Sequence, residues 1–274
     1  MKIIIIGPAH PLRGGLASYN ERLAREFQQQ GHNVTIYTFS LQYPDFIFPG
    51  TTQYSSEPAP TDLSIRIKIN SINPLNWIKV GNELKNQKPD IIVVRYWLPL
   101  MGPALGTILR RVKKNQHTKV ICIADNIIPH EKRLGDTAFT KYFIKAIDGF
   151  VTMSEKVLND LKHFTTKNPA RLVAHPLYDN FGNKILKSEA RAHLQIPNNT
   201  FIFLFFGFIR KYKGLDLLLQ AVHQLKQQNR SFRVMVAGEF YEDRKQYDEL
   251  IAQLNISDQL ILKTVFIPDS EVKY

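Results

Sequence analysis

Short apolar runs alternate with helical patterns along most of the chain, and this alternation restricts the fold more than any other feature. Residues 2–6, 91–94 and 119–124 are each almost entirely apolar and too short for helices. The stretches between them, such as residues 16–30, repeat their apolar residues every three or four positions, which is typical of amphipathic helices. Strands that alternate with helices predict βαβ units, a parallel sheet and ligand sites at the carboxyl ends of its strands.

The alternation is interrupted once, and this interruption divides the chain. Residues 1–180 form a first predicted domain, with an irregular surface excursion at 40–62, and residues 181–199 are predicted to be a linker. The pattern restarts in residues 200–274, a stretch of about 75 residues, where a free-standing doubly wound domain usually has about 100–150. The fold class is therefore α/β, with two Rossmann-like parallel-sheet domains, of which the second is incomplete.

The composition is that of a globular protein in a reducing compartment. Of the 274 residues, 44% are hydrophobic and 22% are charged. Cys122 is the only cysteine, so the chain can form no internal disulfide, and a cytoplasmic setting is the simplest inference. The apolar run at the N-terminus is too short for a signal peptide, and no run approaches the roughly 18 apolar residues that a membrane span needs.

The net charge of +12 is concentrated in the first domain, where residues 1–180 hold 23 basic against 14 acidic residues. Such an excess suits an acidic partner, for example anionic lipid headgroups, a phosphorylated acceptor or nucleic acid. Nucleic acid is the weakest of the three, because the basic segments contain no interleaved aromatic residues and no recognition motif. Ordinary surface charge on helices is the alternative.

A basic loop opens the second domain. The apolar run 201–206 predicts a buried parallel strand that ends at Gly207, and a helical pattern begins at Leu215. Between them lie three cations: Arg210, Lys211 and Lys213. A glycine-bounded basic loop before a helix N-terminus predicts a site for a phosphate or diphosphate, and a solvated basic turn is the alternative.

The corresponding loop of the first domain contains Gly14 and Gly15, which allow the backbone to approach a ligand closely. The spacing is not that of the dinucleotide fingerprint G-x-G-x-x-G. No acidic residue follows the second strand, where Phe39 and Ser40 stand. Both observations argue against a nicotinamide dinucleotide site.

Taken together and in this order, these motifs resemble the GT-B glycosyltransferases, and most closely the retaining family 4 group, also called glycosyl transferases group 1. The first strand ends in Gly7-Pro8, the Gly14-Gly15 loop precedes the first helix, and Lys213-Gly214 opens the second domain before a Leu-rich helix. Val236-Ala237-Gly238 follows the next strand. The resemblance covers essentially the whole chain and implies a GT-B architecture in which two domains face a cleft.

The resemblance implies a role for residues of both domains. Gly14 and Gly15, together with Arg210 and Lys213, are expected to bind the donor diphosphate. The family more often has its arginine directly after the loop glycine, where this chain has Phe208, so Lys213 is the firmer assignment. Glu239 is expected near the donor nucleotide and sugar, as a sugar contact.

The catalytic candidates lie in the loop that follows residues 119–124. The family commonly has a histidine directly after this strand, where this chain has Asp125, and His130 lies further along the same loop. The alternatives are a turn-capping aspartate and a locally bonded histidine. Tyr96 and Trp97, at the end of another strand, are predicted to contact a sugar ring, with a partly buried aromatic plug as the alternative.

By resemblance, the chain is expected to transfer a sugar from a nucleotide-diphospho-sugar to an acceptor with retention of configuration, as in cell-surface polysaccharide biosynthesis. The expected acceptor is a carbohydrate, a lipid-linked molecule or a small molecule. Peripheral contact with the anionic inner face of a membrane is a further expectation. No cofactor and no nucleic acid are expected. No metal is expected either, since the histidines form no i, i+4 pair.

Two alternatives to sugar transfer stay open. A GT-B fold epimerase would need carboxylates such as Asp125 and Glu131. The second alternative is a non-catalytic protein that binds a sugar nucleotide. It stays open because the family's pair of donor-binding glutamates does not occur before Tyr274.

Overall fold

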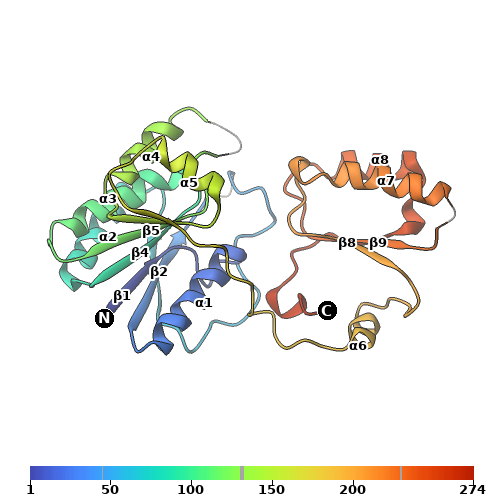
Figure 1. The fold of residues 1–274 in the computed structure, drawn as a ribbon, viewed down its shortest axis with the longest axis horizontal. Coiled ribbons are helices and arrows are strands. Elements are labelled where there is room, and N and C mark those ends of the chain that lie inside the picture. Colours follow the sequence, from blue (N-terminus) through green and yellow to red (C-terminus); the bar gives the residue numbers. More distant parts are fainter. Residues whose placement is uncertain (45, 130–132, 229) are drawn as a thin grey trace. The chain divides into compact units, whose positions relative to one another are not determined.

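The computed structural model describes residues 1–44, 46–129, 133–228 and 230–274, and Figure 1 shows the chain. It divides into two compact units. The first consists of Met1–Asp45 and Tyr54–Leu177, and the second consists of Phe46–Gln53 and Tyr178–Tyr274. The two units are described separately below.

The first unit is built on a parallel sheet in the order β3-β2-β1-β4-β5-β6-β7. Its strands are β1 Lys2–Ile6, β2 Asn33–Leu41, β3 Ile65–Asn70, β4 Ile91–Tyr96, β5 Lys119–Ala124, β6 Gly149–Thr152 and β7 Ala170–Leu172. Among the strands that the structure describes, β3 is an outermost one. The order reverses between β1 and β4, and side chains after these strands therefore meet in the crevice at the switch point.

Helices connect these strands and supply the cover for both faces of the sheet. They are α1 Gly15–Gln29, α2 Pro74–Gln87, η1 Pro99–Met101, α3 Gly102–Lys113, α4 Asp136–Ile144 and α5 Glu155–Lys162. On α1 the predicted apolar stripe packs as expected, with Tyr19, Leu23 and Phe27 against Ile3 and Ile5 of β1 in one core cluster. Ser154 caps α5, since its Oγ accepts a hydrogen bond from the Val157 N–H at 3.3 Å.

The second unit contains a three-stranded parallel sheet in the order β10-β9-β8. Its strands are β8 Ile202–Phe206, β9 Arg233–Ala237 and β10 Leu260–Lys263, and its helices are α6 Lys187–His193, α7 Leu215–Gln227 and α8 Lys245–Leu254. Short 3-10 turns lie at η2 Lys211–Lys213, η3 Ser257–Gln259 and η4 Asp269–Glu271. Figure 1 shows α7 and α8 on one face of this sheet and α6 on the opposite side.

The prediction of a buried strand at 201–206 is wrong in its burial. Phe203, Leu204 and Phe206 of β8 are 42%, 62% and 52% exposed. Among the strands that the structure describes, β8 pairs with β9 alone and thus lies at an edge of its sheet. Only one side of β8 is therefore covered by a neighbouring strand, whatever its apolar composition.

The division of the chain also differs from the predicted one. The first unit ends at Leu177, near the predicted boundary of 180, but the expected linker 181–199 belongs to the second unit. There Ile196 packs with Met235 and Ala237 of β9 in a small apolar cluster. Part of the predicted surface excursion, Phe46–Gln53, likewise belongs to the second unit. Within the described ranges, no helix is long and apolar enough to cross a lipid bilayer.

Candidate functional site

In the first unit, polar side chains meet at the carboxyl ends of β1, β4 and β5. Gly7 directly follows β1, Arg95 lies near the end of β4, and Asp125 directly follows β5, where its N–H donates to the Tyr96 carbonyl at 2.8 Å. Gly7 has no room for a side chain, because an added Cβ would lie 2.5 Å from Nδ2 of Asn20 and 3.0 Å from the Cβ of Arg95. The backbone at Gly7 thus packs directly against the Cβ of Arg95.

Arg95 and Asp125 form a buried bidentate ion pair. Nε of Arg95 lies 2.6 Å from Oδ2 of Asp125, and Nη2 lies 2.5 Å from Oδ1. The two side chains are 3% and 15% exposed. Burial raises the pKa of Asp125 above its ordinary value, and the hydrogen bonds and charge of Arg95 oppose this rise. The two hydrogen bonds hold the pair together, because removal of either group would leave the other as an unpaired buried charge.

Aromatic rings extend this site. The Arg95 guanidinium lies 3.9 Å from the centroid of the Tyr19 ring, which is the geometry of a cation–π contact. Tyr19 in turn meets His175 edge to face, with 5.4 Å between the ring centroids. Among the described residues, Nη1 of Arg95 is buried and has no hydrogen-bond partner. The guanidinium is therefore positioned by Asp125 and Tyr19 and retains an unpaired Nη1 amino group.

These contacts change the interpretation of Asp125. As a predicted catalytic residue it would need an oxygen available for a proton or a sugar hydroxyl, but both of its oxygens accept from Arg95. The geometry therefore favours Asp125 as a residue that positions Arg95. His130, the other predicted catalytic residue, lies outside the described residues.

The predicted sugar contacts of Tyr96 and Trp97 are not found on an open surface, and the alternative of an aromatic plug fits them. Tyr96 is fully buried, stacks on Phe143 with 4.2 Å between ring centroids, and shares a 2.9 Å hydrogen bond with Thr140. Trp97 is 9% exposed and donates its indole N–H to the Tyr43 hydroxyl. Both side chains turn into the core cluster because the last positions of a central strand are covered on both faces.

Gly14 and Gly15 lie at the N-terminus of α1. Gly14 is the N-cap residue, with φ 100°, and no side chain caps the helix. An added Cβ at Gly14 would meet no atom within 4 Å, so the space above the loop is open. The first turn of α1 also contains no acidic residue. The helix end therefore keeps the free N–H groups and positive dipole end that suit an anion.

In the second unit, glycines close the carboxyl ends of β8 and β9. Gly207 has φ 111° and donates its N–H to the Ala237 carbonyl at 3.0 Å. Gly238 has φ 150°, and a Cβ added there would lie 1.9 Å from the Gly207 carbonyl oxygen. Two backbones touch at this point without side chains between them, which only glycine permits.

The basic loop follows this contact. Lys211–Lys213 form η2, in which the Lys213 N–H donates to the Arg210 carbonyl at 2.8 Å, and Gly214, with φ 74°, caps α7 without a side chain. The helix begins at Leu215, as the sequence predicts. The Lys213 side chain is exposed, whereas Arg210 is half-buried, with its guanidinium 5.5 Å from the Tyr241 ring centroid. Lys213, like Lys211, is therefore more exposed than Arg210.

Glu239, predicted as a sugar contact, is 5% exposed and lies beneath the segment Phe46–Gln53. Its Oε1 accepts the Thr51 N–H at 2.6 Å. Tyr241 fixes the same segment, since its ring meets Phe48 edge to face with 5.7 Å between centroids. Oε1 of Glu239 is thus engaged by the backbone of this segment.

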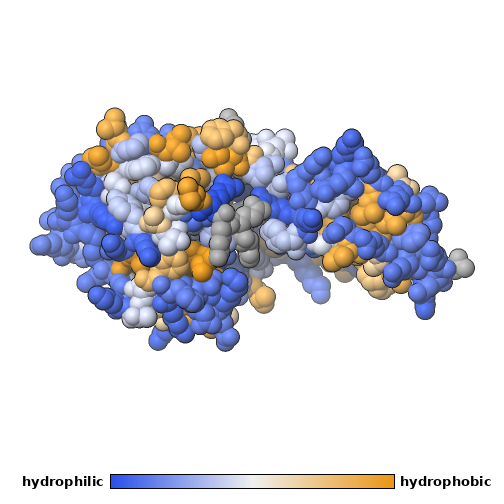
Figure 2. Space-filling view, turned by 90° about the horizontal axis from the view of Figure 1, so that it is seen from above, coloured by the Kyte–Doolittle hydropathy of each residue, from blue (hydrophilic) through white to orange (hydrophobic). Residues whose placement is uncertain are grey.

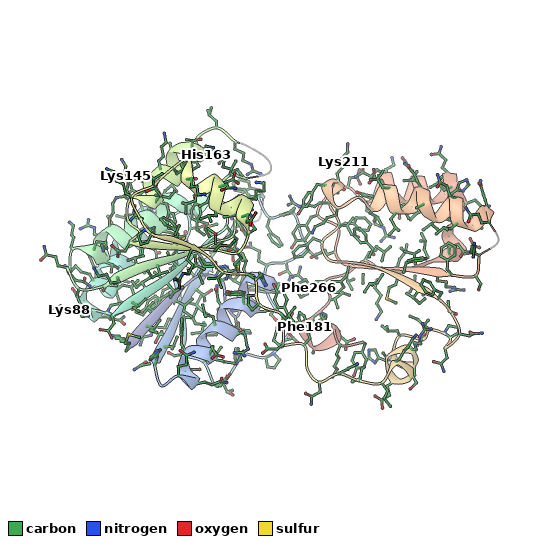
Figure 3. All side chains as sticks on the ribbon, in the orientation of Figure 1. Lys88, Lys145, His163, Phe181, Lys211 and Phe266 are labelled. Atoms are coloured by element: carbon green, nitrogen blue, oxygen red, sulfur yellow. The ribbon has the colours of Figure 1, made fainter. Side chains whose placement is uncertain are left out.

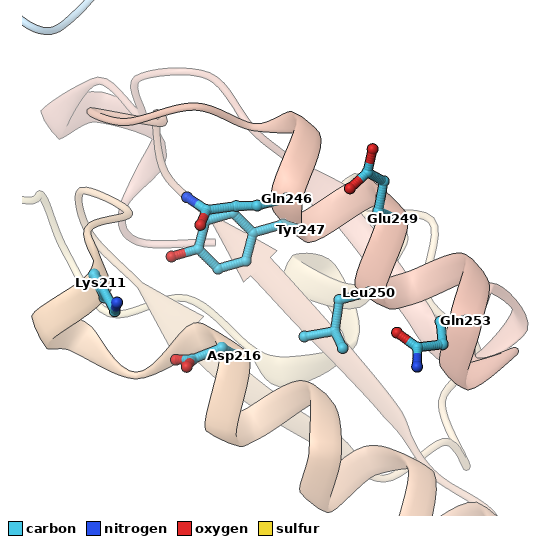
Figure 4. A pocket seen from close by; sticks show the side chains of 7 residues that line it. All are labelled: Lys211, Asp216, Gln246, Tyr247, Glu249, Leu250 and Gln253. Atoms are coloured by element: carbon cyan, nitrogen blue, oxygen red, sulfur yellow. The ribbon is translucent and has the colours of Figure 1, made fainter.

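A separate groove of about 260 Å³ lies between α7 and α8 (Figure 4). Its lining includes Lys211 from the basic loop, labelled at the start of α7 in Figure 3, and two carboxylates, Asp216 and Glu249. Tyr247 also lines it and donates its hydroxyl to Glu242. Because the carboxylates outnumber the lysine, this groove does not suit a diphosphate.

Family models match almost the whole chain. The model for Glycosyltransferase Family 4 matches residues 13–176, and the model for Glycosyl transferases group 1 matches residues 187–273. The chain belongs to glycosyltransferase family 4. Together with the two parallel sheets, this membership agrees with the two-domain Rossmann-like fold that the sequence predicts.

Individual relatives are distant. D-inositol 3-phosphate glycosyltransferase 1 of Catenulispora acidiphila is 33% identical over an alignment of 82 residues. The alignment covers 27% of this chain and 20% of that protein, so it spans about a fifth of the relative's length. The structure of WaaG, a glycosyltransferase involved in lipopolysaccharide biosynthesis, is similar with a TM-score of 0.68 at 15% identity, over 99% of this chain and 71% of that chain. Anabaena HepE in complex with UDP and glucose has a TM-score of 0.66 at 12% identity, over the same shares of both chains.

Sequence reasoning missed the centre of the first-unit site. It assigned no role to Arg95, Tyr19 or His175. One signal was available: a single arginine ends an otherwise apolar buried strand, and a charge in such a place needs a partner. Which carboxylate pairs with it could not be deduced, since Asp125 is 30 residues away.

Proposed function

We propose that this family 4 member transfers a sugar from a nucleotide-diphospho-sugar to an acceptor, with retention of the anomeric configuration. The observation that supports it most is the loop Gly207–Gly214 of the second unit. Its first residue, Gly207, touches the backbone of Gly238 after β9, and at its other end an uncapped helix N-terminus follows the exposed Lys213.

In this proposal Lys213 neutralises the donor diphosphate, and Arg210 assists it. Departure of a nucleoside diphosphate develops negative charge, and a fixed cation together with free N–H groups stabilises that charge in the transition state. Gly14 and Gly15 remain proposed donor contacts from the first unit, since the space above Gly14 is open. No metal or cofactor is required by this scheme, and no protein nucleophile is assigned.

Calorimetric titration with UDP-, GDP- and ADP-sugars tests the donor site. We expect one of them to bind and Lys213→Ala to weaken its binding by about tenfold or more, the magnitude of one lost charge-assisted hydrogen bond. Lys245→Ala is the matched control, because Lys245 lies on α8 of the same unit and its side chain is 78% exposed. Equal affinities of the Lys213→Ala and wild-type chains would show that the basic loop is not the donor site.

Proton NMR of the product tests retention, because it reports the configuration of the new glycosidic bond directly. An epimerase is the second candidate, and its chemistry needs a free carboxylate for proton transfer. Of the two carboxylates expected for it, Asp125 is engaged through both oxygens by Arg95, and Glu131 lies outside the described residues. Incubation with donor alone separates the two, since an epimerase converts the nucleotide sugar without any acceptor.

The acceptor is proposed to be a carbohydrate or a lipid-linked molecule, in a pathway of cell-surface polysaccharide assembly. Support comes from the charge of the first unit and from the similarity to WaaG. A cytoplasmic enzyme that works at the anionic inner face of a membrane is consistent with both.

A further inference from the structure

One short segment belongs to the second unit although the chain on both sides of it belongs to the first. This segment is Phe46–Gln53, which is described throughout and contains no helix or strand, and we call it the strap. Just after the strap, the Ser55 N–H donates to the Pro11 carbonyl at 2.8 Å, within the first unit. Pro11 lies shortly before Gly14, so the strap ends at the first-unit loop that the proposed function assigns to the donor.

The strap covers a buried carboxylate of the second unit. Glu239 is 5% exposed, and its Oε1 accepts the Thr51 N–H at 2.6 Å. A carboxylate that is buried to this degree needs a hydrogen-bond donor, and a backbone N–H bonded to a charged oxygen is one of the stronger kinds of hydrogen bond. A sugar hydroxyl can donate in the same way. The strap thus supplies the hydrogen bond that a donor sugar would supply if Glu239 has its predicted role.

The covered carboxylate is joined to the basic loop through the backbone and through a ring. The Ile209 N–H donates to the Glu239 carbonyl at 2.9 Å, and the Tyr241 N–H donates to the Ile209 carbonyl at 3.0 Å. Arg210, the next residue of the loop, has its guanidinium 5.5 Å from the centroid of the Tyr241 ring. Phe48 of the strap meets the same ring edge to face, at 5.7 Å between centroids. The strap and a cation of the proposed donor site therefore share one aromatic neighbour.

The strap buries little of itself. Phe46 is 88% exposed, and Gln53, at 7%, is the one residue of the strap that is buried. Figure 2 shows hydrophobic side chains, in orange, at the surface of both units, so the exposure of Phe46 does not by itself mark a binding surface. Segments that bury few apolar groups open at a low cost in free energy. The strap can therefore leave Glu239 while the sheet of the second unit stays folded.

We propose that the strap is an autoinhibitory contact, which holds Glu239 in the absence of ligand and leaves it when the donor sugar binds. The inference rests on the proposed function, because it takes the ligand to be a nucleotide-diphospho-sugar bound at the basic loop. A sugar hydroxyl replaces the Thr51 N–H at Oε1, so the carboxylate keeps a hydrogen bond in both states. The donor binds only molecules whose strap is open, and the closed fraction lowers its measured affinity.

Hydrogen exchange followed by mass spectrometry measures the opening of the strap without any sugar transfer. The whole chain is incubated with UDP-, GDP- and ADP-sugars in turn, and exchange in Phe46–Gln53 is compared with exchange in β9. We expect the nucleotide sugar that binds to accelerate exchange in the strap about threefold or more and to leave β9 unchanged. Unchanged or slower exchange in the strap with a bound nucleotide sugar would overturn the proposal.

Variants of the strap test the competition directly in calorimetric titrations with the same nucleotide sugars. Thr51→Pro removes the N–H that Glu239 accepts and leaves the carboxylate in place, so the affinity should rise about tenfold. Phe48→Ala removes the ring contact with Tyr241 and should raise it about threefold. The matched control is Thr61→Pro, at an exposed position outside the strap, which should bind as the wild type does.

The outcomes separate the strap from the proposed function. Circular dichroism confirms that each variant is folded. Equal or weaker binding by Thr51→Pro would overturn the autoinhibitory contact and leave the donor site intact, since a weaker affinity would make the strap a part of that site. If none of the nucleotide sugars binds to the wild type or to Thr51→Pro, both the inference and the proposed function fail.

Discussion

The two sheets of this protein differ in where their first strand lies. In the first unit, β1 is paired with β2 on one side and β4 on the other, and Ile3 to Ile6 are at most 2% exposed. In the second unit, β8 has the same apolar character but pairs, among the described strands, with β9 alone, and Leu204 is 62% exposed. Equally apolar strands thus reach opposite degrees of burial because their neighbours differ.

The buried and the exposed charges of the candidate site divide between the units in the same way. The first unit holds its charges in a buried, fully packed crevice, where Arg95 and Asp125 constrain each other. The second unit holds its cations on an exposed loop, and its rigid part is the glycine contact beneath that loop. The first arrangement suits exact positioning, and the second suits capture of a charged ligand.

The largest expected effect is at the glycine contact of the second unit. Gly238→Ala places a Cβ where the Gly207 oxygen already lies, so we expect a loss of at least about 4 kcal/mol in the stability of that unit. Gly14→Ala in the first unit meets no neighbouring atom and should cost about 1–3 kcal/mol through its positive φ alone. Hydrogen exchange over β8 and β9 measures the first change. Tryptophan fluorescence measures the second, since both tryptophans lie in the first unit.

The next largest expected effect compares the loss of a buried ion pair with the loss of an exposed one. Asp125→Ala leaves Arg95 as an unpaired buried cation and should destabilise the first unit by about 3–5 kcal/mol in denaturant unfolding. The matched variant Asp248→Ala removes the exposed partner of Arg244 in the second unit and should change stability by less than about 1 kcal/mol. Similar costs for the two variants would mean that the Arg95–Asp125 pair is solvated in solution.

The two first strands can be compared directly. Ile4→Ala removes a fully buried side chain from β1 and should cost about 2–5 kcal/mol in urea unfolding followed by tryptophan fluorescence. Leu204→Ala on β8 should cost less than about 1 kcal/mol in hydrogen exchange of the second unit, because most of that side chain already lies in water. A large cost at Leu204 would show that its exposed face is covered in solution.

The smallest expected change in stability comes from a charge on β8. Leu204→Lys should alter stability by no more than about 0.5 kcal/mol, since an exposed position tolerates a lysine. The same substitution should reduce self-association at high protein concentration, because charged residues block pairing at open, apolar sheet edges. Sedimentation velocity measures this. Unchanged association would show that β8 is not the contact surface.

Most secondary structure was predictable from the sequence, because short apolar runs and helical periodicity are local signals. The strands Lys2–Ile6 and Lys119–Ala124 have the predicted bounds, and α7 begins at the predicted Leu215. The candidate site was only partly predictable. The glycine and lysine positions follow from local motifs, but the pairing of Arg95 with Asp125 and the burial of Tyr96 depend on which strands become neighbours.

The sequence by itself determined the α/β class, the two-fold repetition of strand and helix, and the basic loop at Lys213. These depend on residues that are close together in the chain. Only the tertiary structure decided that β8 is an exposed edge, that Glu239 lies beneath Thr51 from 188 residues away, and that Asp125 is bound to Arg95. Burial and ion pairing depend on strand order and on long-range contacts, and a local pattern of residues does not specify them.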